Sequence, residues 1–189
     1  MINKSGITEH IRAQEEEYFR KKDRELIENL RRADAIARER LALEQETGIH
    51  DPEMLGELAE LGFHPDTIAL LPLVPVLQVA WAKAGVSTPE RRLILNLARS
   101  RGIAPGGAAD RQLAEWLDSR PSDETFHKAT RLIGAMIEAP QHRVNVDAHE
   151  LIEYCEKIAH ASGGIFGIGK VSHEEREALK EIAEALKAR

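Results

Sequence analysis

Two pairs of serine and glutamate are the residues of this sequence whose types and spacing suggest a specific chemical role. Ser87 and Glu90 form one Ser-x-x-Glu motif, and Ser172 and Glu175 form a second. The motif is typical of a capping box, in which the serine hydroxyl accepts a hydrogen bond from the glutamate N–H and the carboxylate accepts one from the serine N–H. Glu90 and Glu175 are also candidates to hold a cation together, but capping explains both without a ligand and is favoured.

A metal-binding bundle built from a larger acidic set is a weaker hypothesis. Its further candidates are three aspartates elsewhere in the chain, Asp110, Asp118 and Asp123. The eight histidines are scattered along the sequence, whereas a zinc site needs three or four nitrogen or sulfur ligands that converge. We therefore predict that the protein binds no metal and no cofactor.

A glycine-rich segment at residues 164–170 matches most of the phosphate-loop pattern. That pattern follows a buried strand and requires Ser or Thr directly after its lysine. Here Val171 follows Lys170, and a helix is expected before the segment. We predict instead a loop whose Ile165 and Phe166 cover the core or contact a partner.

The sequence contains no signature of a catalytic nucleophile. Its single cysteine, Cys155, lies in a helical run with no cluster of positive charge around it, so a packed thiol is expected rather than a reactive one. No Gly-x-Ser-x-Gly elbow is present. We predict that the protein is not an enzyme.

Both capping motifs belong to a phrase that the chain repeats. Residues 79–91 (VAWAKAGVSTPER) return as 158–164 (IAHASGG) and, after an insertion at 165–170, as 171–176 (VSHEER). Each copy has the pattern of a helix end, a glycine turn and a new helix. The duplication predicts an all-α fold with pseudo-twofold symmetry.

Composition limits the classes of partner. The net charge of −6 among 189 residues argues against a general nucleic-acid binder. One cysteine fits a reducing compartment. The longest apolar stretch, 68–82, is interrupted by two prolines and is too short to span a bilayer, and the N-terminus has no apolar signal core. We expect a cytoplasmic protein with no integral membrane segment and no nucleic-acid partner.

Hydrophobic periodicity predicts a long charged helix over 7–47 within an N-terminal region 1–48, followed by a bundle of about seven helices in 49–189. The bundle helices are expected at 52–62, 66–84 (bent or restarted at Pro72 and Pro75), 87–101, 108–118, 122–139, 144–161 and 172–187.

The long helix carries one narrow apolar stripe, formed by Phe19, Leu26, Leu30, Ala33, Ala37 and Leu41. A helix of roughly 40 residues is about 60 Å long, more than a compact domain of the remaining size needs. The stripe must therefore pack on the bundle, on a second copy or on another protein. A coiled-coil stalk, dimeric or intramolecular, is the favoured interpretation.

The repeated phrase and its surroundings, over about residues 52–188, resemble the TerB-like family, named for tellurite-resistance proteins of bacteria. The resemblance implies a pseudo-symmetric helical bundle with repeats of the form Ala-x-Ala-Asp-Gly-x-(Ile/Val)-Ser-x-x-Glu, whose aspartates contribute to a metal-linked acidic site. This chain has Lys83 and Ser162 at the aspartate positions and keeps the glutamates, Glu90 and Glu175. Because an ammonium group repels a divalent ion, the resemblance implies the fold rather than the metal site.

A shorter stretch, residues 13–26, resembles the inhibitory segment of the mitochondrial ATP synthase inhibitor protein. Glu16, Glu17, Tyr18, Phe19 and Arg20 fit the family's Glu-Glu-x-Tyr-Phe-Arg phrase, with Tyr18 shifted by one position. The pH-sensing histidines of that family are missing. The resemblance implies a helix that inserts between subunits of a rotary ATPase and blocks turnover.

We therefore expect a non-enzymatic bacterial protein that acts by protein–protein binding, in tellurite, metal or envelope stress, with the long helix as its dimerisation or docking arm. The alternatives are a regulator or inhibitor of a rotary ATPase and a metal-ion-binding bundle. Self-association would give a homodimer. The predicted partner-binding residues are Tyr18, Phe19, Arg20, Leu26, Leu30, Ile165 and Phe166.

Overall fold

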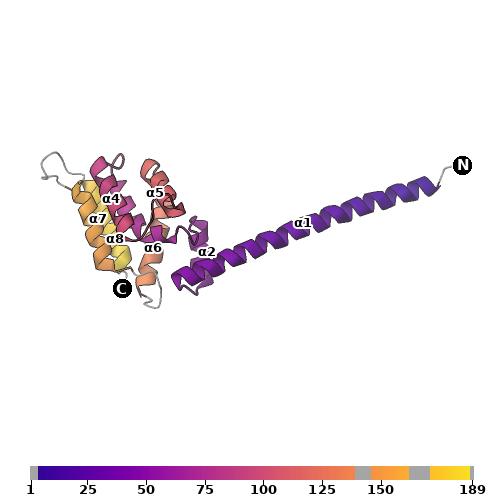
Figure 1. Ribbon diagram of the computed structural model, residues 1–189, viewed down its shortest axis with the longest axis horizontal. Helices are drawn as coiled ribbons and strands as arrows, with labels where there is room; N and C mark the ends of the chain where they lie inside the picture. Colours follow the sequence, from indigo (N-terminus) through magenta and orange to yellow (C-terminus); the bar gives the residue numbers. More distant parts are fainter. Residues whose placement is uncertain (1–3, 139–145, 162–170, 188–189) are drawn as a thin grey trace. The chain divides into compact units, whose positions relative to one another are not determined.

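The fold is all-α, as the sequence predicts. The structure is a computed structural model that describes residues 4–138, 146–161 and 171–187. Within these ranges every regular element is helical and no strand occurs (Figure 1). The elements are α1 (Lys4–Thr47), α2 (Pro52–Glu60), the 3-10 helix η1 (Ile68–Leu73), α3 (Val74–Ala80), α4 (Thr88–Ser100), α5 (Ala108–Asp118), α6 (Asp123–Glu138), α7 (Ala148–Ala161) and α8 (His173–Lys187).

The chain forms two compact units, residues 1–41 and 42–189. The division falls inside α1, so the last residues of this helix belong to the bundle, where Leu43 and Thr47 are fully buried. The helix ends at Gly48, which takes a positive φ of 71° and donates its N–H to the Glu44 carbonyl over 2.8 Å. Glycine adopts this left-handed conformation without the steric penalty of a Cβ.

Residues 15–41 are helical because their charges are spaced to support a helix. Three acidic residues each pair with an arginine four positions later on the exposed surface, in the pairs Glu16–Arg20, Glu28–Arg32 and Asp34–Arg38. An acid placed before a base at this spacing is the more favourable orientation, and each pair contributes about 0.2–0.5 kcal/mol. The segment also contains no proline or glycine.

Two predicted helix boundaries are wrong. Residues 66–84 restart at the prolines rather than bend there, since η1 gives way to α3, but α3 ends at Ala80 and not at residue 84. Pro72 and Pro75 explain the change, since proline lacks the backbone donor of an α-helix and clashes with the preceding turn. The helix predicted at 144–161 begins only at Ala148, because the Asp147 carboxylate caps it by accepting the Glu150 N–H over 2.8 Å.

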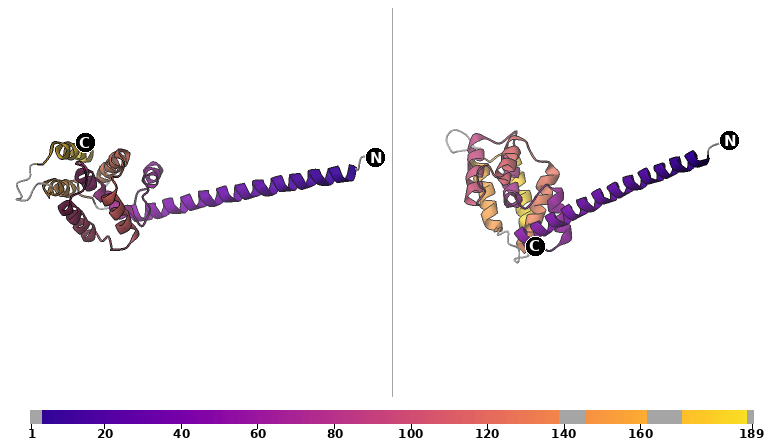
Figure 2. Two further views of the ribbon diagram at one scale, coloured as in Figure 1. Left: turned by 90° about the horizontal axis from the view of Figure 1, so that it is seen from above. Right: turned by 45° about the vertical axis from the view of Figure 1, so that its right-hand side comes forward.

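Helix α3 lies at the centre of the bundle. It contacts η1, α4, α6, α7 and α8, and α7 in turn lies beside α4 and α8 (Figures 1 and 2). Six of its seven residues are buried, so it is apolar around nearly its whole circumference, as expected of a helix enclosed by others. The two copies of the repeated phrase begin at the ends of α3 and α7, and the central position of α3 brings them together.

Helices α6 and α8 approach each other at Gly134. A Cβ atom added to this glycine would lie 2.5 Å from the carbonyl oxygen of Ala185 on α8. Real Cβ atoms do not tolerate such a distance, and the obstructing atom belongs to a backbone that cannot rotate away. The absence of a side chain at Gly134 therefore sets the spacing of the two helices.

We predict that Gly134→Ala lowers the free energy of unfolding by about 1–3 kcal/mol, as overpacking in a well-packed core does. The expected sign is informative, because alanine is the better helix former by about 1 kcal/mol and would stabilise α6 if there were room. Urea denaturation of both proteins measures the difference.

The matched control is Ala135→Gly, at the next, exposed position of the same helix. It should lower stability only by the difference in helix propensity, about 1 kcal/mol or less. A Gly134→Ala variant as stable as the parent would show that α6 and α8 can move apart at this contact without a loss of stability.

Candidate functional site

The first capping box opens α4. The Ser87 N–H donates to Glu90 Oε2 over 2.6 Å, and the Glu90 N–H donates to Ser87 Oγ over 3.4 Å. Glu90 is only 2% exposed. The predicted reciprocal capping is confirmed, and the cap holds a carboxylate inside the protein.

The second capping box opens α8 with the same geometry. The Ser172 N–H donates to Glu175 Oε2 over 2.7 Å, and the Glu175 N–H donates to Ser172 Oγ over 3.2 Å. Glu175 is completely buried. The guanidinium of Arg176 donates to the Val171 carbonyl over 2.8 Å and so ties the backbone just before α8 to the first turn of this helix. The repeated phrase therefore builds the same local structure twice.

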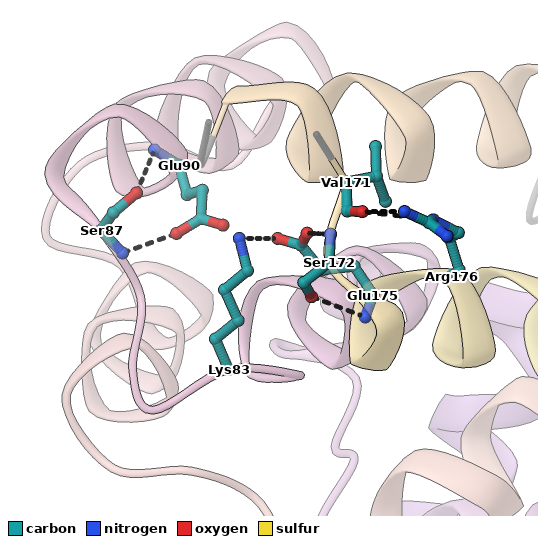
Figure 3. Close-up of polar contacts among 7 residues, drawn as sticks. All are labelled: Lys83, Ser87, Glu90, Val171, Ser172, Glu175 and Arg176. Carbon is teal, nitrogen blue, oxygen red and sulfur yellow. Dashed lines mark hydrogen bonds and ion pairs between the residues drawn. The ribbon is translucent and has the colours of Figure 1, made fainter. Parts of the chain in front are cut away.

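Lys83, which lies just before the first capping box, forms an ion pair with the glutamate of the second. Its Nζ lies 2.9 Å from Oε1 of Glu175, and its side chain is 34% exposed. Figure 3 shows the Lys83 ammonium between the two glutamates, with the Glu90 carboxylate turned toward it from the side opposite Glu175. A residue of the first phrase thus neutralises the buried glutamate of the second, and an isolated carboxylate in this position would be strongly unfavourable.

The arrangement suits a structural cluster better than a metal site. Both oxygens of the Glu175 carboxylate are engaged, one by Lys83 and the other by the Ser172 N–H. In the described ranges no group of three or more His, Cys, Asp or Glu residues is placed to hold a metal ion.

The three aspartates proposed for a larger metal site are not gathered around the glutamates. Each forms an ion pair with an arginine near it in the fold, in the pairs Asp110–Arg99, Asp118–Arg91 and Asp123–Arg120. Asp110 also accepts the Gly106 N–H over 2.7 Å, and this bond, followed by the one from Arg99, lowers the pKa of its carboxyl. These residues order loops and helix ends.

We predict that Lys83→Met lowers the free energy of unfolding by about 1–3 kcal/mol, because Glu175 would remain buried without its cation. The range is below that of a fully buried pair, since Lys83 is partly exposed and water screens part of the interaction. The double variant Lys83→Met with Glu175→Gln should recover part of the loss, because the amide oxygen of glutamine can still accept the Ser172 N–H.

The matched control is Lys180→Met, which removes a charge from an exposed position of α8. Chemical denaturation of the variants at neutral pH completes the comparison. If Lys83→Met is no more destabilising than Lys180→Met, the ion pair does not support the bundle.

Cys155 is a core residue of α7. Its side chain is fully buried, and this burial, with a smaller contribution from Glu156, raises the pKa of the thiol to about 12. A thiol with this pKa has almost no nucleophilic thiolate at neutral pH. The predicted packed thiol is confirmed.

We predict that a thiol-reactive disulfide reagent modifies Cys155 very slowly in the native protein, since the thiolate fraction at pH 8 is about 10⁻⁴. In denaturing urea the thiol is exposed, its pKa falls to the ordinary range and modification should be fast. Absorbance of the released chromophore measures both rates. Equal rates in the native and unfolded chain would contradict the burial of this side chain.

The second candidate site is the exposed apolar surface of α1. Seven large hydrophobic side chains there are 47–61% exposed: Tyr18, Phe19, Leu26, Ile27, Leu30, Ile36 and Leu41. The rings of Tyr18 and Phe19 meet edge to face with centroids 5.9 Å apart, and Arg20 is paired with Glu16. Ile165 and Phe166, also predicted to contact a partner, lie outside the described residues, as does the glycine-rich segment 164–170.

Sequence reasoning missed three features of these sites. Lys83 appeared only as a departure from an acidic pattern, although a cation four residues before a capping serine is a usable signal when another glutamate is buried nearby. Ile27 and Ile36 lie on either side of the stripe, so its spacing does not include them. Gly134 had no signal, since a helical glycine reveals its packing partner only in three dimensions.

A small apolar groove lies between α4 and α7, where the partly exposed Leu93 contributes to its wall. Its volume of about 280 Å³ is slightly below the usual range of ligand pockets. We assign it no ligand. Its lining residues are Leu93, Asn96, Leu97, Ser100, Tyr154, Lys157 and Ile158.

Comparisons with protein-family models, with curated proteins and with solved structures find no significant match to this chain. Within the part of the chain that the structure describes, no helix is both long enough and apolar enough to cross a lipid bilayer.

Proposed function

We propose that this protein is a non-enzymatic binding protein whose N-terminal helix docks onto another protein chain. The observation that carries the proposal is the stripe of exposed large hydrophobic side chains on one face of α1, formed by Phe19, Leu26, Leu30 and Leu41 and flanked by Tyr18, Ile27 and Ile36. Contiguous apolar surface of this kind, rimmed by charged residues, marks interaction sites on soluble proteins. The stripe residues Phe19, Leu26 and Leu30 form its centre.

The free energies of association and of side-chain burial indicate that several apolar residues, rather than one, are needed for binding. Association loses an estimated 4–15 kcal/mol of translational and rotational freedom, whereas burying one leucine or phenylalanine side chain contributes about 1.5–3 kcal/mol. One or two such contacts would not hold a complex together. Four on one face, Phe19, Leu26, Leu30 and Leu41, would contribute about 6–12 kcal/mol, which is comparable with that loss. The aromatic pair Tyr18–Phe19 with Arg20 adds the composition of an interface hot spot.

The bundle provides the folded base of the docking helix. Leu43 and Thr47 near the end of α1 are buried in it, and Lys83 of the first repeated phrase pairs with the capping glutamate of the second. Duplicated Ser-x-x-Glu caps with buried glutamates support the TerB-like resemblance, and we extend the proposal to a cytoplasmic role in tellurite, metal or envelope stress. The docking helix is the working part in this role.

A photo-crosslinking residue placed at Leu30 tests the proposal in the native cell. We expect covalent adducts to protein, several times more abundant than those from the same residue placed at Ala35. Ala35 is exposed on the opposite face of the same helix and is the matched control. Mass spectrometry of the adducts identifies the partner, including a second copy of this chain or an ATPase subunit.

Equal yields from the two positions, or no adduct from either, would contradict docking through the stripe. Leu30→Asp provides an independent check, because a carboxylate in the stripe should abolish the complex while leaving the circular dichroism of the bundle unchanged.

A further inference from the structure

We propose that the occupant of the stripe is a second copy of the same helix, and that residues 16–40 of two chains form an antiparallel coiled coil. This inference rests on the proposed function and names the partner of that site. It is carried by the exposed apolar side chains of α1 and by the order of charges along the same face.

The stripe has the seven-residue repeat of a coiled coil. Phe19, Leu26 and Ala33 occupy one core position, with Arg40 one repeat later. The other core position is occupied by Glu16, Asp23, Leu30 and Ala37. Because these residues alternate at spacings of three and four along α1, they share one face and would meet the partner helix layer by layer.

A parallel pair would bring identical residues together in every layer. Glu16 would face Glu16 of the second copy, Asp23 would face Asp23, and Arg40 would face Arg40. Each of these layers places like charges in the least solvated part of the interface, where their repulsion is strongest. The charges of α1 therefore oppose the parallel arrangement in three separate layers.

An antiparallel pair removes each of these conflicts in a single register. Leu26 packs against Leu30 of the second copy, and symmetry repeats this layer, so four leucines form the centre. On each side the large Phe19 ring faces the small Ala37 side chain. Asp23 faces Ala33 and can turn its carboxylate toward water.

Charge complementarity extends to the ends and edges of the same register. Glu16 meets Arg40 of the second copy at each end of the pair. Along one edge Arg20 meets Asp34, and Ile27 meets Ile27 at the middle. Arg20 and Asp34 are exposed and hold partners within their own helix, Glu16 and Arg38, so these charges can be shared across the interface without a large rearrangement.

Disulfide trapping distinguishes the two arrangements. Two single variants, Leu26→Cys and Leu30→Cys, are made in full-length chains that also carry Cys155→Ala, one of them with a size tag. A disulfide needs Cα atoms about 4.4–6.8 Å apart. In the antiparallel register, position 26 of one chain faces position 30 of the other. The two copies of position 26 are about 6 Å apart along the axis, and the separation of the helices adds to this distance.

After mild oxidation of the mixed variants, we expect the heterodimer of Leu26→Cys with Leu30→Cys as the main cross-linked species. Each variant oxidised alone should remain mostly uncross-linked. Preferential self-cross-linking of each variant would show a parallel pair and would overturn the proposal.

The unmodified full-length chain supplies the second measurement, in case the cysteine variants weaken association. Sedimentation equilibrium should give the mass of a dimer at about 100 µM, as for a micromolar complex. Arg20→Asp should weaken the dimer about three- to tenfold, and adding Asp34→Arg in the same chain should restore it. A monomer at this concentration would overturn the homodimer, while adducts to another protein from Leu30 would leave the docking function standing.

Discussion

The bundle depends on the pairing of one lysine with a carboxylate that has no access to water. Glu175 is held inside by its role as a capping residue, and the ammonium of Lys83 makes that position tolerable. A capping glutamate on the surface needs no such partner, because water solvates the carboxylate. Here the repeated phrases meet in the interior, so the geometry that starts α4 and α8 also creates a charge that a third residue must neutralise.

The two units of the chain differ in whether their apolar side chains are buried or exposed. Residues 42–189 enclose theirs around α3, with close contacts such as that between Gly134 and Ala185. Residues 1–41 have too few apolar side chains to make a core and display them in a row along a helix supported by local ion pairs. Helices in proteins gain most of their stability from packing an apolar face against other elements. One chain therefore combines a bundle that encloses its apolar side chains with a helical segment that leaves them exposed.

Much of this organisation was predictable, and the exceptions have physical causes. Periodicity and helix caps place most of the helices, and Ser-x-x-Glu identified both caps, because these signals are local. In the segment 66–84 the two prolines indicate a bend or a restart, but periodicity shows neither the 3-10 geometry of the first part nor the end of α3 at Ala80. The pairing of Lys83 with Glu175 and the contact at Gly134 join residues far apart in sequence, so no local pattern encodes them. The sequence predicts that the stripe packs on the bundle, on a second copy or on another protein. It does not show which, so the exposure of the stripe in the single chain is only one of the outcomes that the sequence allows.

The pairing of Lys83 with Glu175 also affects when the bundle can close during synthesis of the chain. About 90 residues separate the two, so at synthesis rates of about 5–20 residues per second the lysine leaves the ribosome roughly 5–20 s before its partner. During that interval η1 and α3 have been made, but the helices that cover them, α6, α7 and α8, have not all emerged. The most apolar segment of the protein is therefore synthesised seconds before the helices that cover it. The order of the elements along the chain delays closure of the core until the last helix has been made.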